Sequence, residues 1–220
     1  MITSRLFRFN SGDIVVTYEI RRCIHAEECV HGLPAAFDPK RKPWVDPEAA
    51  PAAEVARVIE RCPTGALQYE RTDGGPQEIP PPTNRIRIAA DGPLYLHGRV
   101  RVDGVDGQTI VRDSRVALCR CGKSGLKPFC DGSHTRTGFK DAGAVPGPEV
   151  ETAAGKSEEG ALVISCTADG PLAITGEFEL MDAAGAVVAR GNAAWLCRCG
   201  GSGNKPFCDG THKKNGFKSS

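Results

Sequence analysis

The sequence predicts an α+β protein: a small N-terminal α+β domain followed by a β-rich pair of repeats. A cysteine-rich pattern of sixteen residues occurs twice, at 119–134 and at 197–212, which is an offset of 78 positions. Upstream of each copy the apolar residues alternate, which is typical of half-buried strands. The N-terminal region instead combines one alternating stretch with one stretch of helical spacing.

The composition predicts a folded, soluble chain. Of its 220 residues, 40% are apolar and 25% are charged, and the formal net charge is +1. This balance gives no reason to expect a nucleic acid or a membrane surface as partner. The sequence has no apolar run of membrane-spanning length, and the N-terminus lacks the apolar core of a secretory signal. We therefore expect a cytoplasmic protein.

Three elements are predicted in the N-terminal domain. Alternating apolar residues over 14–20 predict a strand. Apolar residues at helical spacing after Pro51, as far as Cys62, predict a helix that begins at the proline. Leu67 and Tyr69 fit a short closing strand. Together these elements predict a small α+β unit.

The domain boundaries follow from composition. Thr72–Asn84 contains Gly74–Gly75 and three consecutive prolines, which is typical of a linker between domains. The segment 141–160 is rich in Gly, Ala, Pro and Glu, and we expect a loop there. The predicted domains are 1–75, 85–141 and 160–220.

Each repeat is longer than its cysteine pattern. Alternating apolar positions predict a strand before each pattern, interrupted at Gly98 and Gly176, where a bulge or a close backbone approach is expected. A further strand, at 109–118 and at 187–196, leads into each pattern. One repeat is too small to bury a sufficient core, so we expect the two to pack about a pseudo-two-fold axis within a monomer.

The repeated pattern has metal-ligand chemistry. Three thiolates and one imidazole per copy suit zinc or an iron–sulfur cluster. We call the two copies the first motif and the second motif. The candidate ligands are Cys119, Cys121, Cys130 and His134 in the first motif, and Cys197, Cys199, Cys208 and His212 in the second.

Three further cysteines lie in the N-terminal domain. Cys23 and Cys29 keep the outer positions of a Cys-x2-Cys-x2-Cys run, Ala26 occupies the middle one, and Cys62 is followed by proline. The segment resembles the divergent mono-cluster ferredoxin-like domain. Three thiolates favour a [3Fe-4S] cluster, and the alternatives are a [4Fe-4S] cluster with His25 as an extra ligand or buried structural thiols.

Both motifs resemble the CDGSH iron–sulfur family, whose members include mitoNEET-like proteins. The shared pattern is Cys-x-Cys-x2-Ser-x3-Pro-x-Cys-Asp-Gly-Ser/Thr-His, with Thr211 in the second copy. The resemblance implies one [2Fe-2S] cluster per motif, with the Cys-x-Cys pair on the inner iron and the Cys–His pair on the outer iron. Tandem copies resemble the monomeric branch of the family, which implies a pseudo-dimer. A structural zinc site is the alternative for the same four ligands.

The resulting prediction is a non-enzymatic one-electron carrier with three iron–sulfur clusters. Its partner would be a redox protein. The alternative is a protein that stores or transfers clusters to an apo acceptor, or senses redox state or pH, and a zinc-binding interaction module is a third reading. The sequence leaves the partner, the potentials and the nuclearity of the N-terminal cluster open. Cys166, Trp44 and Trp195 are expected to be core residues rather than ligands.

Overall fold

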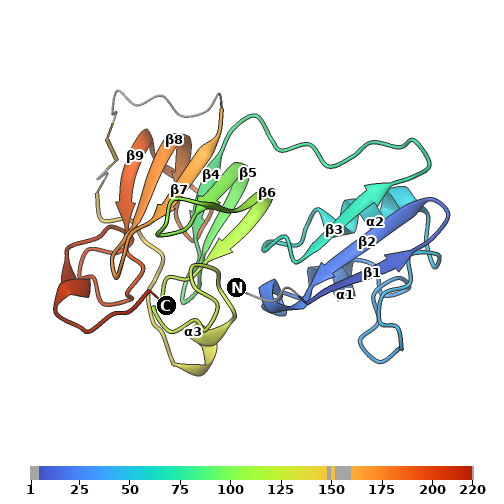
Figure 1. The fold of residues 1–220 in the computed structure, drawn as a ribbon, viewed down its shortest axis with the longest axis horizontal. Helices are drawn as coiled ribbons and strands as arrows, with labels where there is room; N and C mark the ends of the chain where they lie inside the picture. Colours follow the sequence, from blue (N-terminus) through green and yellow to red (C-terminus); the bar gives the residue numbers. More distant parts are fainter. Residues whose placement is uncertain (1–4, 148–149, 152–159, 220) are drawn as a thin grey trace. The chain divides into compact units, whose positions relative to one another are not determined.

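The computed structural model describes residues 5–147, 150–151 and 160–219. The chain divides into two units, Met1–Ile79 and Pro80–Ser220 (Figure 1). The division falls inside the segment predicted as a linker, whereas much of the predicted loop 141–160 lies outside the described residues. Among the residues that are described, no helix has the length and apolarity needed to cross a membrane.

The N-terminal unit is an antiparallel three-stranded sheet with two α-helices. The sheet has the order β1-β2-β3, with Tyr18 of β2 opposite Leu67 of β3. Strand β2 alternates buried and half-buried positions, as its sequence predicts, while the edge strand β1 was not predicted. The elements are β1 (Leu6–Asn10), β2 (Ile14–Glu19), η1 (Ile20–Arg22), α1 (Glu28–Gly32), α2 (Ala52–Ile59) and β3 (Leu67–Arg71).

Helix α2 supplies much of the core of this unit. It follows Pro51 as predicted, and its apolar face is buried, including Val55 and Ile59 at 0% exposure. The helix ends before Cys62, so this cysteine lies in the following turn, where its N–H donates to the Ile59 carbonyl at 2.9 Å. The turn rather than the helix therefore sets the position of the Cys62 sulfur.

The second unit consists of the two repeats, and the strands predicted from alternation are present in both. The first repeat contains β4 (Arg85–Ile88), β5 (Leu94–Asp103), β6 (Thr109–Leu118) and α3 (Ser133–Arg136). The second contains β7 (Leu162–Cys166), β8 (Leu172–Met181), β9 (Val187–Leu196) and η2 (Thr211–Lys213). The described part of the chain is thus mainly β, with short helices, which confirms the β-rich prediction for the repeats.

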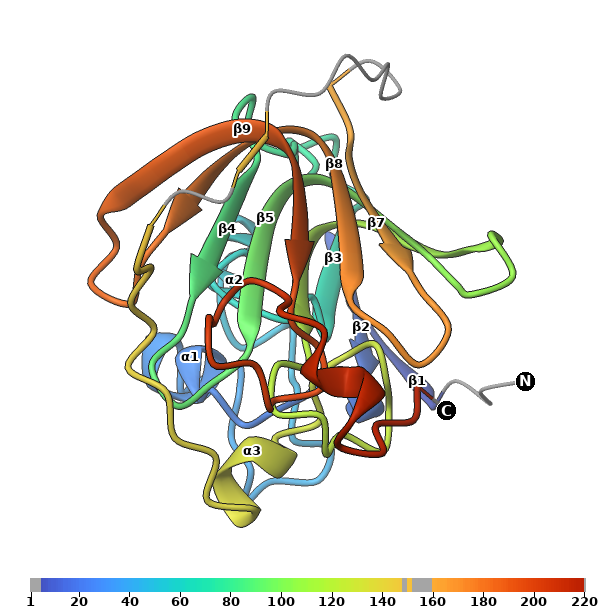
Figure 2. The same ribbon diagram turned by 90° about the vertical axis from the view of Figure 1, so that its left-hand side faces the viewer.

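The two repeats exchange their first strands. β4 pairs antiparallel with β5 of its own repeat and parallel with β8 of the other, and β7 pairs antiparallel with β8 and parallel with β5. Figures 1 and 2 show these strands side by side in one sheet. Since each repeat completes the sheet of the other, their apolar side chains form a single buried core.

The long strands β5 and β8 are each interrupted at a glycine. The registers of β5 and β8 shift between His97 and Val100 and between Thr175 and Phe178, so each break spans one of the glycines, as predicted. Gly176 has φ +101°, and a Cβ there would lie 2.1 Å from a backbone oxygen of the neighbouring strand segment. Gly98 lies equally close to Asn84, and only glycine fits either position.

The expectations that Cys166, Trp44 and Trp195 belong to the core have different outcomes. Cys166 is 6% exposed in the core, as predicted. Trp195 is 53% exposed, so the expectation that it anchors the core is wrong. It occupies an outward-facing position of β9, between the buried Ala194 and Leu196. Trp44 packs edge-on against Tyr18, with ring centroids 4.9 Å apart, beside the core of the first unit.

Candidate metal centres

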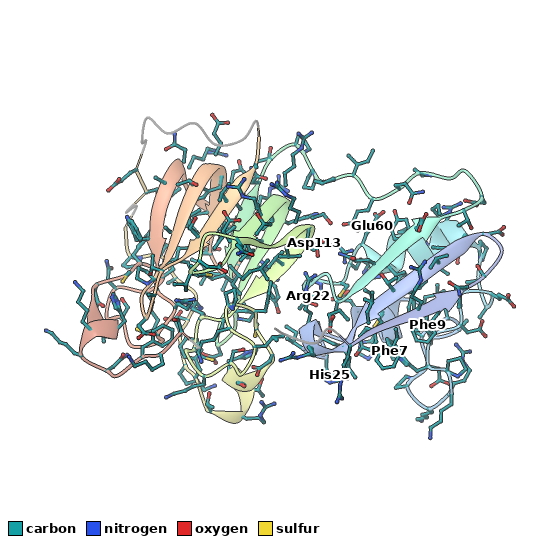
Figure 3. The ribbon with its side chains drawn as sticks, viewed as in Figure 1. Phe7, Phe9, Arg22, His25, Glu60 and Asp113 are labelled. Carbon is teal, nitrogen blue, oxygen red and sulfur yellow. The ribbon has the colours of Figure 1, made fainter. Side chains whose placement is uncertain are left out.

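The three N-terminal cysteines line one cavity of about 640 Å³. The wall of the cavity is mainly apolar and aromatic, and Ala26 and His25 lie on it as well. Figure 3 shows Phe7 and Phe9 on β1 and His25 in the loop after η1. The aromatic residues of the wall are Phe7, Phe9, Tyr18 and Trp44.

Three different elements position these sulfurs. Cys23 ends η1, and its N–H donates to the Ile20 carbonyl at 3.2 Å. Cys29 lies in the first turn of α1, and Cys62 lies in the turn after α2. The loop between the first two cysteines has left-handed φ angles at His25 (56°) and Glu27 (61°), on either side of Ala26. The fold thus brings the distant Cys62 to the same cavity as the local pair.

The cavity disfavours a free thiolate at Cys29. Burial and the neighbouring Cys62 raise the pKa of Cys29 to about 11. Burial also raises the pKa of Tyr18, and a hydrogen bond to Cys23 adds to that effect. Without a metal the Cys29 thiol remains neutral at pH 7, so a cation that replaces its proton is needed to stabilise the thiolate.

The eight candidate ligands of the motifs are arranged as four pairs. In the first motif the sulfurs of Cys119 and Cys121 lie 3.7 Å apart, and the Cys130 sulfur lies 3.4 Å from His134 Nδ1. The second motif repeats both distances, 3.7 Å for Cys197–Cys199 and 3.4 Å for Cys208–His212. The two copies therefore have the same local geometry.

These distances suit two ligands on one tetrahedral metal ion. With metal–sulfur bonds of about 2.3 Å and metal–nitrogen bonds of about 2.0–2.1 Å, tetrahedral angles place two sulfurs about 3.8 Å apart and a sulfur and a nitrogen about 3.6 Å apart. Among the described residues, no group of three or more His, Cys, Asp or Glu side chains surrounds a single ion position. Each pair within a motif thus has the spacing of two ligands on one metal ion.

Backbone hydrogen bonds hold the two pairs of each motif together. The N–H of Cys119 donates to the Pro128 carbonyl at 2.8 Å, and the N–H of Cys130 donates to Ala117 at 2.9 Å. The second motif has the same bonds, from Cys197 to Pro206 and from Cys208 to Trp195. The loop is thereby folded back on the end of β6 or β9.

A carboxylate organises the turn that carries each histidine. Asp131 accepts from the N–H groups of Gly125 and Ser133, both at 2.9 Å, and Asp209 accepts in the same way from Gly203 and Thr211. The bonds from Thr211 hold the pKa of Asp209 well below its usual range. The N-cap residues themselves are Gly132 and Gly210, and the turn is the short helix α3 in the first motif and the 3-10 turn η2 in the second.

Backbone amides also point at the sulfurs. The N–H groups of Lys123 and Gly132 lie 3.5 Å from the sulfurs of Cys121 and Cys130, and that of Gly201 lies 3.4 Å from Cys199. Amide donors to ligand sulfur favour the more negative, reduced state of a cluster.

The sulfurs differ in their tendency to ionise. Sharing a hydrogen bond with Cys119 lowers the pKa of Cys121 to about 7 and raises that of Cys119. Burial raises the pKa of Cys130 to about 12 and lowers that of His134. Burial thus favours the neutral ring of His134, which is the form that binds metal.

An arginine inside each Cys-x-Cys was missed by the sequence analysis. Arg120 and Arg198 are both 1% exposed. Arg120 Nε donates to the Gly92 carbonyl at 2.9 Å, and Arg198 Nε donates to the Gly170 carbonyl at 3.1 Å. The repeat itself contained the signal, because both arginines and both glycines are related by the 78-residue offset. Each arginine fixes its Cys-x-Cys against the turn that precedes β5 or β8.

Family models match three segments of the chain. The model described as "Divergent 4Fe-4S mono-cluster" matches residues 9–72. The model described as "Iron-binding zinc finger CDGSH type" matches residues 91–135 and 169–213. These segments contain all the candidate ligands named above.

A curated relative matches as well. "Uncharacterized protein YjdI" of Escherichia coli (strain K12) is 41% identical over 64 residues, which are 29% of this chain and 84% of that protein. The protein of the same name from Escherichia coli O157:H7 matches with the same values. No solved structure matches the chain significantly.

The matched segments and the ligand geometry together define a protein with iron–sulfur binding domains. The chain belongs to the divergent 4Fe-4S mono-cluster family in its N-terminal unit and to the CDGSH iron-binding family in both repeats.

Proposed function

We propose that the protein carries three iron–sulfur clusters and transfers single electrons between them and a partner protein. The observation that carries the proposal is the pairing of ligands, with the same two distances in both motifs. A [2Fe-2S] cluster needs two protein ligands on each of two irons, which is the arrangement described above. A mononuclear zinc site instead needs all four ligands around one ion.

In this proposal each motif holds one [2Fe-2S] cluster. Cys119 and Cys121 bind the inner iron, and Cys130 and His134 bind the outer one. The corresponding ligands of the second motif are Cys197, Cys199, Cys208 and His212. When bound, each cluster supplies a one-electron couple, while the buried arginines and the amides directed at sulfur set its electrostatic surroundings.

The N-terminal cavity would hold the third cluster on Cys23, Cys29 and Cys62. Three thiolates support [3Fe-4S], and His25 on the cavity wall is the candidate fourth ligand for [4Fe-4S]. Ala26→Cys separates the two cases. If the native cluster is [3Fe-4S], the added thiolate provides the ligand for a fourth iron, so that the variant assembled with excess iron would hold [4Fe-4S] and lose the paramagnetic signal of the oxidised protein. If His25 is a ligand, His25→Ala creates that signal.

Electron transfer without catalysis is the role that these assignments support. Every group assigned here binds a cluster or holds a ligand in place, so we propose that the protein is not an enzyme. Both repeats belong to one chain and complete one sheet, which supports a monomer with an internal pseudo-dimer. We further propose that it acts in the cytoplasm on a redox partner protein.

One observation favours cluster transfer or sensing as a second candidate. Cys199 and Cys208 of the second motif are half-buried, whereas Cys121 and Cys130 of the first are buried. An acceptor protein therefore has easier access to the second cluster.

Incubation of the loaded protein with apo-ferredoxin, beside a one-electron redox titration, distinguishes these roles. Electron transfer predicts reversible titration with the clusters retained. Rapid loading of the acceptor would instead support cluster transfer.

A further inference from the structure

The two motifs differ in the charge that faces the buried arginine. Arg120 Nη1 donates to the Asp141 carboxylate, and the Arg120 side chain is fully buried. Arg198 has the equivalent place in the second motif, but the residue 78 positions after Asp141 is Ser219. One repeat thus has a buried ion pair where the other has a buried cation.

The backbone at the two positions is otherwise the same. The N–H of Asp141 donates to Asp91 Oδ1 at 2.7 Å, and the N–H of Ser219 donates to Asp169 Oδ1 at 2.8 Å. An aspartate at 219 would therefore begin from the same anchored backbone as Asp141. The difference between the repeats lies in this side chain and not in the path of the chain.

Within the described part of the chain, Arg198 makes no hydrogen bond to a carboxylate. Its hydrogen bonds go to the carbonyls of Thr167 (2.5 Å) and Gly170 (3.1 Å). The nearby Asp169 is bound to Lys218 Nζ at 2.7 Å. Burial raises the pKa of the neighbouring Cys166, so this thiol stays neutral and does not offset the guanidinium. An arginine keeps its charge over the whole working pH range.

The solvent exposure of the ligand sulfurs also differs between the two motifs. The second-motif ligands Cys199 and Cys208 are half-buried, while their counterparts Cys121 and Cys130 are buried. A [2Fe-2S] cluster with three thiolates and a neutral imidazole has charge −1 when oxidised and −2 when reduced. Water and a nearby cation both stabilise the more negative state, so both differences favour reduction at the second motif.

We propose that the two [2Fe-2S] centres are not equivalent and that the second motif accepts the first electron, because Arg198 lacks the carboxylate that neutralises Arg120. This inference rests on the proposed function. Asp141 and Arg198 are positioning residues in it, since they act on the potentials and are not cluster ligands. Electrons would then enter or rest at the second motif before the first.

Arg198 lies between the second-motif ligands Cys197 and Cys199 in the chain, and its charge reaches Cys119 of the first motif. A carboxylate added beside Arg198 therefore lowers both potentials to some extent, and the difference between the two is the quantity to measure. Moving the carboxylate from one repeat to the other leaves the net charge unchanged and isolates that difference.

The test is a redox titration of the loaded full-length protein, followed by electron paramagnetic resonance of the reduced [2Fe-2S] centres. The wild type is expected to reduce in two steps, with at least about tenfold preference for the second motif, or about 59 mV. His212→Cys adds a negative charge at the second motif, so the reduction step that it shifts belongs to that motif. The proposal is overturned if both centres are reduced in a single step. It is also overturned if the step at the higher potential is shifted by His134→Cys rather than by His212→Cys.

Ser219→Asp should narrow the gap between the reduction potentials of the two motifs. Ser219→Asn, whose side chain is neutral and similar in size to aspartate, should leave this gap unchanged. The double variant Asp141→Asn with Ser219→Asp should narrow the gap further or invert it. A gap that none of these variants changes, or that Ser219→Asn changes as much as Ser219→Asp, would contradict a role for the carboxylate.

Iron and acid-labile sulfide are measured on every sample before titration. Absence of sulfide from the wild type would refute the proposed function itself. Two loaded centres with equal potentials would refute only the inequivalence. Thermal unfolding of each variant without clusters shows whether a changed potential reflects an altered fold.

Discussion

Gly122 of the first motif lies against the backbone of Cys199 in the second. A Cβ on Gly122 would be 2.4 Å from the Cys199 carbonyl oxygen, and a Cβ on Gly200 would be 2.5 Å from that of Cys121. Both glycines have left-handed φ angles, +75° and +77°. The two ligand loops therefore contact each other through backbone at the Cys-x-Cys pairs, and neither has room for a side chain there.

Gly122→Ala should destabilise the repeat unit and reduce cluster content. The left-handed conformation alone costs an alanine about 1–3 kcal/mol, and the contact with Cys199 adds to this cost. Denaturant unfolding and iron content measure the two effects. Gly125→Ala is the matched control, because its nearest neighbouring atom is Asp131 Oδ2 at 3.6 Å. Equal losses in both variants would show that contact between the loops is not the cause.

Asp141→Asn should lower the free energy of unfolding by about 3 kcal/mol or more, because it leaves Arg120 buried without its counter-charge. The side chains of Arg120 and Asp141 are 0% and 14% exposed. Lys140→Met is the control: it removes an ion pair with Asp91 whose lysine is 80% exposed, so little change is expected. Similar denaturation midpoints for the two variants would argue against a stabilising buried pair.

Tyr18→Phe should lower the potential of the N-terminal cluster. The Tyr18 hydroxyl makes a hydrogen bond to Cys23, and donors to ligand sulfur stabilise the reduced state. The expected change is several-fold to tenfold in the reduction equilibrium, up to about 59 mV. Tyr69→Phe serves as control, since that hydroxyl donates to Glu60 at 2.6 Å. An unchanged potential in the Tyr18 variant would show that this hydrogen bond does not stabilise the reduced cluster.

Much of the fold could be predicted from the sequence because its signal is local. Alternation identified the strand that became β5 (Leu94–Asp103) and its counterpart β8 (Leu172–Met181), and the 78-residue offset related them. Pairing of β4 with β8 could not be predicted, because the alternating pattern of a strand does not name its neighbour. The wrong assignment of Trp195 has a similar cause: its neighbours in the sequence are apolar, but it lies on the outer face of β9.

The site was predictable to a similar degree. Cysteine and histidine spacing identified the candidate ligands, and the structure places them in pairs. The buried arginines escaped notice because arginine is mostly a surface residue. Only the fold shows that the turn before β5 offers carbonyls to Arg120. The difference between Asp141 and Ser219 can be interpreted only when the position of the buried arginine is known.

His134→Cys should slow loss of the first cluster in acid. Burial lowers the pKa of His134, so the neutral ring that binds metal persists to lower pH than in an exposed histidine and is lost as the pH falls through that lowered value. A thiolate ligand resists protonation more strongly when bound to metal. The decay of visible absorbance at a series of pH values measures the rate of loss.

The slope of that rate against pH should flatten in His134→Cys, while His97→Ala, which changes an exposed residue of β5, should keep the wild-type slope. If both variants retain that slope, the proposed ligation by His134 is wrong.

The nature of the metal in the two motifs is the central claim, and elemental analysis tests it most directly. Protein purified without oxygen from iron-replete cells is assayed for iron, zinc and acid-labile sulfide, and the assay is repeated with Cys119→Ser and Cys197→Ser. We predict a coloured protein with equal amounts of iron and sulfide at the motifs, and loss of one cluster in each variant. Zinc at one ion per motif, with no sulfide and no visible absorbance, would contradict it.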